Sequence, residues 1–320
     1  MAKITVGILR GGPSSEYDVS LKTGENVLRS LPEGMYKGID IFISRDGEWH
    51  HKGIVRSPET ILRHVDVAFN AMHGEYGEDG TVQKILERHA IPYTGSDAIA
   101  SRFAMKKNVA KELLSRAGLK VLPSILVKPE DDVEDTCRVV HRAMAPPWVV
   151  KPAGKGSSVG VSIVRTLPNL ADALTEALRI DSAALVEKYI NGREATCGVL
   201  ENFREETYYA LPVIEIIPPK GKFFDYQCKY DGSTQEICPG RFSPREKTHI
   251  QDAAIRAHKA LGCRHYSRTD MMLANDTVWV LEINTLPGLT SESLLPKSAE
   301  AIGLSFPALL DHIVRLAIKK

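Results

Sequence analysis

The segment 266–284, YSRTDMMLANDTVWVLEIN, contains two strand-like runs separated by a short polar stretch. Apolar, β-branched and aromatic residues favour strands, and the Asn-Asp pair between the runs favours a tight turn. We therefore predict an antiparallel hairpin here. Because side chains alternate between the faces of a sheet, the second strand is expected to have two unlike faces. One carries Trp279, Leu281 and Ile283, and the other carries Val280, Glu282 and Asn284.

An acid and an amide in so apolar a strand need an explanation. An odd number of loop residues would place Asp270 across from Glu282, and Arg268 across from Asn284. Facing carboxylates repel each other by about 1–4 kcal/mol, and a divalent cation turns this repulsion into attraction. With Asn284 they form a set of hard oxygen donors that suits Mg²⁺ or Mn²⁺, ions that often share their coordination with substrate phosphates. A solvated polar sheet face explains the hairpin alone equally well.

A glycine-rich loop, KPAGKGSSVGV at 151–161, follows an apolar strand. Glycines let a backbone approach a phosphate closely, while Ser157, Ser158, Lys151 and Lys155 add hydroxyl donors and positive charge. The loop matches neither the GxxxxGK[ST] nor the GxGxxG nucleotide-binding pattern. A phosphate-binding loop and a plain hairpin turn both explain it.

Two acids follow in VEKYINGRE, Glu187 within a strand and Glu194 beyond a turn. Surface charge on an edge strand accounts for both. Acids at such places also bind ribose hydroxyls in other nucleotide sites.

Strands and helices alternate over residues 1–96, which predicts a small parallel α/β domain. The strands are ITVGIL, GIDIFIS and VDVAFNAM, and the helices are 19–31 and TVQKILERH. The carboxyl ends of the strands, at Gly11-Gly12 and at 72–74, are expected at one edge, where such sheets bind ligands.

The rest of the chain reads as α+β. Residues 97–185 contain the helix KKNVAKELLSRAG, two strands around the glycine loop and the helix LADALTEAL, and suggest a small subdomain. Residues 186–320 contain the strands ALVEKYI, EATCGVL and YYALPVIEII, the helix IQDAAIRAHKALG, the hairpin and a final helix near 306–318.

Charge and cysteine content exclude several partner classes. The 41 basic and 40 acidic residues give a net charge of +1, which provides no reason to expect nucleic acid or an anionic membrane as partner. No apolar run is long enough to span a bilayer, and the first twelve residues predict a strand rather than a signal peptide. The five cysteines are scattered without a CxxC pair, which favours reduced thiols in the cytoplasm over a zinc site.

Taken together, the motifs resemble the D-alanine–D-alanine ligase family of the ATP-grasp superfamily. Those that carry the resemblance are, in order, GGPSSEYDVS, HGEYGEDGTVQ, YTGS, KPAGKGSSVGV, EKYINGRE, FDYQCKY, RTDMML and LEINTLPGLTSESLLP. The resemblance implies a Rossmann-like N-terminal substrate-binding domain (1–96), a central ATP-grasp lid subdomain (97–185) and a C-terminal catalytic subdomain (186–320).

The resemblance also implies an activity. ATP would phosphorylate the carboxylate of one D-alanine, and the amine of a second would displace phosphate to give D-alanyl-D-alanine for peptidoglycan synthesis. Two Mg²⁺ or Mn²⁺ ions, a cytoplasmic location and a homodimer belong to the same expectation. Alternatives are a D-alanine–D-serine ligase, a D-alanine–D-lactate ligase (against which Tyr230 in the KY pair argues) and another ATP-grasp carboxylate–amine ligase.

For the nucleotide, the resemblance implies contacts by residues of both ATP-grasp parts. Lys107 (rather than Lys106), Lys151 and the loop 157–160, including Ser158, would bind phosphates. Adenine would lie against residues 187–190, which include Glu187, Lys188 and Ile190, with Phe223 and Lys229 close by. Glu194 would bind ribose, and Asp270, Glu282 and Asn284 would hold the metal ions.

For the amino acids, the implied contacts come from both ends of the chain. Glu16 would bind the ammonium of the first D-alanine and form hydrogen bonds with Ser157 and Tyr230. His73 would lie at its carboxylate, Ser293 and Leu294 at the carboxylate of the second. Arg268 and the N–H of Gly288 would face the tetrahedral oxyanion. Each also has a plain structural explanation, such as a first-turn helix acid for Glu16.

Overall fold

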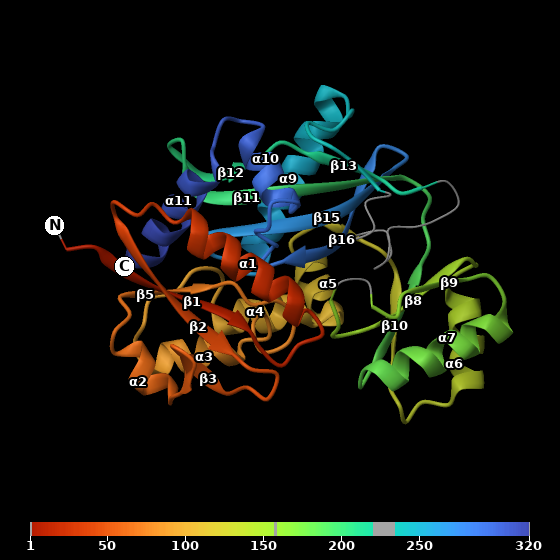
Figure 1. The fold of residues 1–320 in the computed structure, drawn as a ribbon. Coiled ribbons are helices and arrows are strands. Elements are labelled where there is room, and N and C mark those ends of the chain that lie inside the picture. Colours follow the sequence, from red (N-terminus) through yellow and green to blue (C-terminus); the bar gives the residue numbers. More distant parts are fainter. Residues whose placement is uncertain (1, 157–158, 220–233, 320) are drawn as a thin grey trace.

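The structure is a computed structural model that describes residues 2–156, 159–219 and 234–319. Its strands form three sheets, each with its own helices (Figure 1). Five residues with predicted roles lie outside the described residues: Ser157, Ser158, Phe223, Lys229 and Tyr230. Among the described residues, no helix is both long and apolar enough to span a membrane.

The N-terminal sheet has the order β4-β3-β2-β1-β5 and is parallel at its centre, as predicted. Its strands are β1 (Ile4–Gly11), β2 (Tyr36–Ile43), β3 (Trp49–His51), β4 (Ile54–Val55) and β5 (Val67–Asn70), with helices α1 (Tyr17–Ser30), α2 (Pro58–Leu62) and α3 (Thr81–Arg88). The central strands are apolar because both of their faces are buried. Gly11 ends β1 with φ +92°, and a Cβ there would lie 2.2 Å from the Ile43 carbonyl oxygen, so only glycine fits.

The second sheet is antiparallel and has the order β7-β10-β8-β9. Its elements are β7 (Ser124–Val127), α6 (Val133–Ala143), β8 (Trp148–Pro152), β9 (Ser162–Val164), α7 (Leu167–Ile180) and β10 (Ala184–Lys188). The two helices pack against each other and share an apolar core with the sheet. The glycine loop lies between β8 and β9 in the chain.

The third sheet has the order β14-β13-β11-β15-β16-β6, and β12 pairs with β11. The strands are β6 (Lys120–Val121), β11 (Arg193–Phe203), β12 (Glu206–Ala210), β13 (Ile214–Ile217), β14 (Gln235–Ile237), β15 (Tyr266–Ala274) and β16 (Thr277–Asn284). The helices are α4 (Ala98–Met105), α5 (Lys107–Arg116), α9 (Pro244–Ala260), α10 (Leu294–Glu300) and α11 (Phe306–Ile318). The prediction of one strand over YYALPVIEII is wrong. Pro212, which has no N–H to donate to a ladder, lies in the break between β12 and β13.

The β15–β16 hairpin differs from its prediction in an instructive way. Its loop has two residues, Asn275 and Asp276, with φ of +48° and +56°, so the condition of an odd loop, on which the opposition of Asp270 and Glu282 depended, is not met. Asp270 nevertheless pairs with Glu282, because a bulge leaves Leu281 without a partner. The bulge supplies the extra residue that the loop lacks.

The same bulge overturns the predicted faces of β16. Val280 and Ile283, expected on opposite faces, share one buried core cluster. Leu281 and Glu282, also expected on opposite faces, both line the same pocket. A single extra residue reverses the alternation beyond it, so the acid faces a pocket while the strand stays anchored in the core.

The three-part division of the chain stays a prediction. The structure adds that β6 pairs with β16 and that α5 packs on β16 and α9, so residues before 122 contribute to the third sheet. An apolar cluster that includes Phe69, Leu200 and Leu309 joins the N-terminal sheet to the third sheet and to α11.

His265 links the N-terminal sheet to the third sheet, and its burial predicts how the stability of the fold depends on pH. Burial, with the nearby Arg264, lowers the pKa of His265 to about 4, and its Nδ1 accepts a hydrogen bond of 3.1 Å from the Gly95 N–H. The imidazole ring of His265 is therefore neutral in the folded protein. Because the unfolded chain binds the proton more readily, stability should fall as the pH drops from about 6.5 towards 4, by roughly 1.4 kcal/mol per pH unit for this group.

The variant His265→Asn should flatten this part of the curve, since asparagine tolerates the positive φ of +66° without titrating. The measurement is urea unfolding of both proteins from pH 7 to 4.5. Parallel curves for the two proteins would show that His265 does not titrate between the native and unfolded states.

Candidate active site

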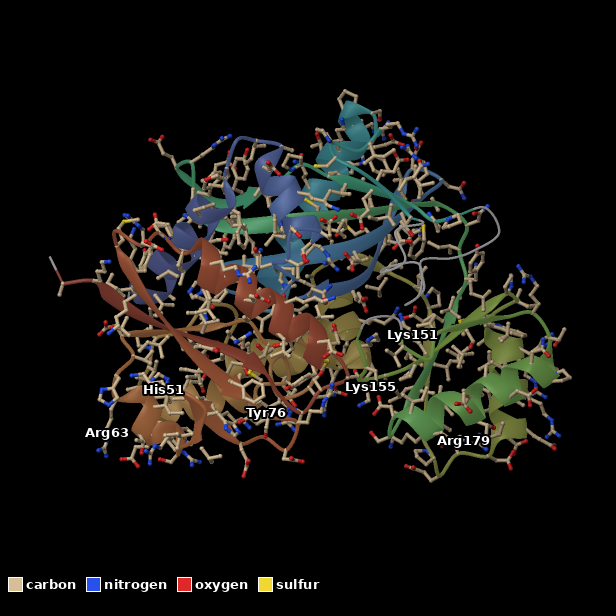
Figure 2. The ribbon with its side chains drawn as sticks, viewed as in Figure 1. His51, Arg63, Tyr76, Lys151, Lys155 and Arg179 are labelled. Carbon is tan, nitrogen blue, oxygen red and sulfur yellow. The ribbon has the colours of Figure 1, made fainter. Side chains whose placement is uncertain are left out.

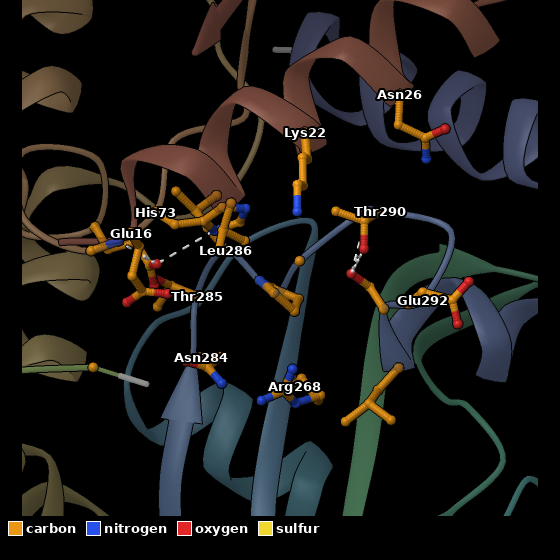
Figure 3. A pocket seen from close by; sticks show the side chains of 18 of the residues that line it. Glu16, Lys22, Asn26, His73, Arg268, Asn284, Thr285, Leu286, Thr290 and Glu292 are labelled. Carbon is orange, nitrogen blue, oxygen red and sulfur yellow. Dashed lines mark hydrogen bonds and ion pairs between the residues drawn. The ribbon is translucent and has the colours of Figure 1, made fainter. Parts of the chain in front are cut away.

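A pocket of about 850 Å³ lies where the N-terminal sheet meets the third sheet. Its walls are α1, the loop after β5, the end of β16 and the segment that leads into α10 (Figure 3). The predicted residues that line it are Glu16, His73, Lys107, Arg268, Glu282, Asn284, Gly288, Ser293 and Leu294. The structure thus brings residues between positions 16 and 294 of the chain to the wall of one pocket.

A second pocket of about 170 Å³ lies between the second and third sheets. The lining residues for which the sequence suggests a role include Lys107, Lys151, Lys155, Glu187, Lys188, Ile190, Glu194, Asp270 and Glu282. Apolar side chains, including Leu122, Ile163 and Met272, make up much of the remaining wall. Lys107 and Glu282 line both pockets, so the two cavities meet at these side chains.

The paired carboxylates stand at this junction. Asp270 and Glu282 are partners on adjacent strands, and their side chains are 16% and 27% exposed. Arg268 donates two hydrogen bonds to Asp270, of 2.9 and 2.8 Å, and Thr196 donates a third of 2.6 Å. Lys107 Nζ lies 3.6 Å from Glu282 Oε2. Each acid thus faces a protein cation at the junction.

These donors fit a hard divalent cation. All of them are oxygen atoms, from the carboxylates of Asp270 and Glu282 and from the amide of Asn284. These three residues line one or both of the two pockets. No group of three or more His, Cys, Asp or Glu side chains poised for a metal occurs in the described part of the chain. A cation here would therefore complete its shell with oxygens that are not protein carboxylates, such as those of a phosphate.

A buried charge cluster lies at the inner wall of the smaller pocket. Glu187, 2% exposed, accepts hydrogen bonds from Lys111 at 2.7 Å and pairs with Lys151 at 2.8 Å. Burial alone would raise the pKa of the Glu187 carboxyl, but Lys151 and Lys111 outweigh it and hold the pKa below its ordinary value. Burial also lowers the pKa of Lys111. Two lysines and one carboxylate leave the cluster with an excess positive charge.

Glu16 and His73 lie on the N-terminal side of the larger pocket (Figure 3). Glu16 is the N-cap residue of α1, and its side chain makes no capping hydrogen bond. Its position at the start of α1 is compatible with the plain explanation, since an acid there is favoured by the helix dipole. His73 is 4% exposed and forms a hydrogen bond of 2.8 Å with Thr23 Oγ1, while its Nδ1 lies 3.7 Å from Glu78. These contacts fix the ring at the pocket wall.

The opposite wall is the segment after β16. Asn26 of α1 donates a hydrogen bond of 2.7 Å to the Leu289 carbonyl and ties this segment to the N-terminal sheet. Ser293 Oγ accepts from the Thr290 N–H at 3.0 Å, and a Cβ on Gly288 would lie 2.8 Å from it. Gly288 therefore allows a close approach that a larger residue would obstruct.

Sequence reasoning missed two lysines. Lys22 projects from α1 into the larger pocket (Figure 3), and it forms no ion pair with any of the residues that the structure describes. Lys111 follows Lys107 by one helical turn, a spacing that could have signalled a shared face. Arg241, for which the sequence suggests no role, donates to Glu215 at 3.1 Å, and Arg193 donates to the same carboxylate.

Comparisons with known proteins identify the family. The family model described as "D-ala D-ala ligase C-terminus" matches residues 113–315, and "D-ala D-ala ligase N-terminus" matches residues 51–96. A D-alanine–D-alanine ligase of Syntrophobacter fumaroxidans is 43% identical over 99% of this chain and 98% of its own. Another, of Trichlorobacter lovleyi, is 41% identical over 98% of this chain and 95% of its own.

Solved structures of ligases are also similar to this chain over nearly its whole length. The VanG D-Ala:D-Ser ligase of Enterococcus faecalis is similar with a TM-score of 0.88 and 32% identity, covering 99% of this chain and 100% of that one. The D-alanine–D-alanine ligase of Bacillus anthracis complexed with ATP has a TM-score of 0.81 and 33% identity, covering 99% and 98%. The fold class predicted from the sequence is confirmed, and the chain belongs to the D-alanine–D-alanine ligase family.

Proposed function

We propose that this chain joins two D-alanine molecules into D-alanyl-D-alanine at the expense of ATP, as a step towards peptidoglycan. The observation that carries the proposal is that Lys107 and Glu282 line both pockets. A phosphate bound at the end of the smaller pocket would therefore lie beside a carboxylate bound in the larger one. Phosphoryl transfer between two bound substrates requires that proximity.

ATP would bind in the smaller pocket. Its adenine would lie against the apolar wall, its ribose would reach Glu194, and Lys151 and Lys107 would meet the phosphates. Mg²⁺ or Mn²⁺, when held by Asp270, Glu282 and Asn284, would neutralise negative charge on the phosphates. With Lys107 already beside Glu282 at 3.6 Å, one lysine and one carboxylate would share the task of placing the transferred group.

The first D-alanine would bind in the larger pocket, its ammonium at Glu16 and its carboxylate towards His73. One carboxylate oxygen attacks the terminal phosphorus, a new O–P bond forms, and the bond to ADP breaks, which gives D-alanyl phosphate. The protein then has to position this acyl phosphate and exclude water from it.

The second D-alanine would bind near Ser293 and Leu294 with its neutral amine towards the acyl carbon. The attack forms a C–N bond through a tetrahedral oxyanion, the C–O bond to phosphate then breaks, and the nitrogen releases one proton to give the amide. Arg268 and the Gly288 N–H would stabilise that oxyanion. The Arg268 guanidinium suits this role because Asp270 more than offsets its burial and raises its pKa, so it stays charged.

D-Serine is the competing second substrate, because the chain resembles a D-Ala:D-Ser ligase with a TM-score of 0.88. Mass spectrometry of the products formed from a mixture of D-alanine, D-serine and D-lactate with Mg-ATP separates the candidates. We expect D-alanyl-D-alanine to dominate at neutral pH. A dominant D-alanyl-D-serine would reassign the second substrate, and no phosphate release under varied pH and metal would contradict the ligase activity itself.

A cytoplasmic location and a homodimer complete the proposal. ATP as a substrate and the free thiols of Cys137, Cys197, Cys238 and Cys263 support the location. The homodimer rests on the family resemblance alone.

A further inference from the structure

Lys155, in the middle of the glycine loop, forms an ion pair with Glu75 of the loop after β5. The pair bridges the second sheet and the N-terminal sheet, and Figure 2 shows Lys155 between these two parts of the molecule. Both side chains are about one-third exposed, at 31% and 29%. Ser14 Oγ donates a hydrogen bond of 3.3 Å to the other oxygen of Glu75, which fixes the acid on the N-terminal side.

The same stretch of loop is held at two further points. Lys107 Nζ donates a hydrogen bond of 2.5 Å to the Lys155 carbonyl, and the Gly154 N–H donates one of 2.6 Å to Asp181. Beside them Gly156 passes so close to Glu16 that a Cβ there would lie 2.7 Å from Glu16 Oε1. The start of the loop is thus held by Asp181 at the Gly154 N–H, by Lys107 at the Lys155 carbonyl and by Glu75 at the Lys155 side chain.

We infer that the Lys155–Glu75 ion pair is a positioning contact that holds residues 154–156 of the glycine loop close to Glu16, beside the junction of the two pockets. This inference rests on the proposed function. Glu75 supplies the charge on the N-terminal side and Lys155 the charge on the loop. The reaction depends on the attraction between them and not on which side carries the positive charge.

This differs from the role that the loop sequence suggests for Lys155, which is a contact to a phosphate. The two roles make opposite predictions for an exchange of charges. If Lys155 met a phosphate, a lysine moved to position 75 could not replace it. If the pair positions the loop, the exchange restores the attraction.

The experiment compares Lys155→Glu, Glu75→Lys and the double variant K155E/E75K in the phosphate-release assay. A partly exposed ion pair contributes a factor of about two to five, and its reversal to like charges adds a repulsion of similar size. We therefore expect kcat/KM for ATP to fall about ten-fold in each single variant, through a higher KM as well as a lower kcat. The double variant should recover to within about three-fold of the wild type.

Two controls make the result specific. The variant pair K128E and E130K, with their double, reverses an exposed Lys–Glu pair in the turn after β7 and should leave all constants unchanged. Partial unfolding would lower the apparent kcat at unchanged KM, and thermal melting measures it directly. If a reversed variant does not fold, the neutral variants Lys155→Met and Glu75→Gln replace it, each with an expected loss of about three-fold.

The outcomes are distinct. Recovery in the double variant supports the positioning contact. Unchanged single variants, or a double variant as impaired as the singles, would overturn it. A wild type that is inactive with D-alanine and Mg-ATP would contradict the proposed function instead.

Discussion

Replacement of Glu282 by glutamine is expected to lower turnover at least ten-fold while the protein stays folded. The carboxylate lies opposite Asp270 on the neighbouring strand and lines both pockets, so it is the acid at which bound phosphate and bound amino acid would meet. Glutamine keeps the shape but removes the charge that holds a divalent cation. The loss should appear in kcat, because charge develops on the transferred phosphoryl group only as the reaction proceeds.

The measurement is phosphate release at saturating ATP and D-alanine over a range of Mg²⁺ and Mn²⁺ concentrations. We expect the variant to need more metal for half-maximal rate and to melt within a few degrees of the wild type. Glu112→Gln, an exposed acid on α5 paired with Arg116, is the matched control and should change nothing. Turnover equal to that of the wild type at every metal concentration would remove the metal assignment from Glu282.

The hairpin illustrates how far the sequence can predict this site. Alternation and the Asn-Asp turn suffice for two antiparallel strands, and the opposition of Asp270 and Glu282 follows if the loop is odd. The loop is even, and a bulge at Leu281 restores the opposition. A bulge adds one residue to one strand of a pair, and nothing in the alternation of VWVLEIN marks where that residue is inserted. The sequence could therefore predict that the two strands pair in an antiparallel hairpin, but it could not predict which side chains lie on each face of β16.

Lys111 marks a second boundary of prediction. On α5 it reads as one more surface lysine, and only the approach of β10 to that helix reveals that it is buried against Glu187. Lys155 is similar, since its partner Glu75 lies 80 residues away in the chain. Charges whose partners are distant in sequence cannot be assigned from spacing, whereas those in motifs of fixed order, such as Arg268 and Asp270, can.

The Glu187 cluster should show the largest effect on stability. Glu187→Gln would leave the ammonium groups of Lys111 and Lys151 buried together without a carboxylate. Loss of one member of a buried ion pair typically costs about 3–5 kcal/mol, so we expect a loss of about 3 kcal/mol in the free energy of unfolding, measured with urea at pH 7. Affinity for ATP should fall as well, because Lys151 would lose the contact that orients it.

Lys111→Met is the matched comparison, and its cost should be smaller than that of Glu187→Gln. Two lysines share one carboxylate, so removal of Lys111 leaves a balanced pair of Lys151 and Glu187, whereas removal of Glu187 leaves two like charges. The methionine also fills the space of the buried lysine stem. If Lys111→Met lost more unfolding free energy than Glu187→Gln, repulsion between the two lysines would not be the main cause of the instability.

The pH dependence supplies an independent check of the same cluster. The pKa of Glu187 lies below its ordinary value of 4.5 in the folded protein, so its contribution is complete above that value and is lost as the pH falls through the folded pKa. The difference in unfolding free energy between wild type and Glu187→Gln should therefore be constant from pH 7 to about 5 and shrink in more acidic solution. A difference that persisted unchanged into acid would show that packing, and not the charge of Glu187, makes the cluster stable.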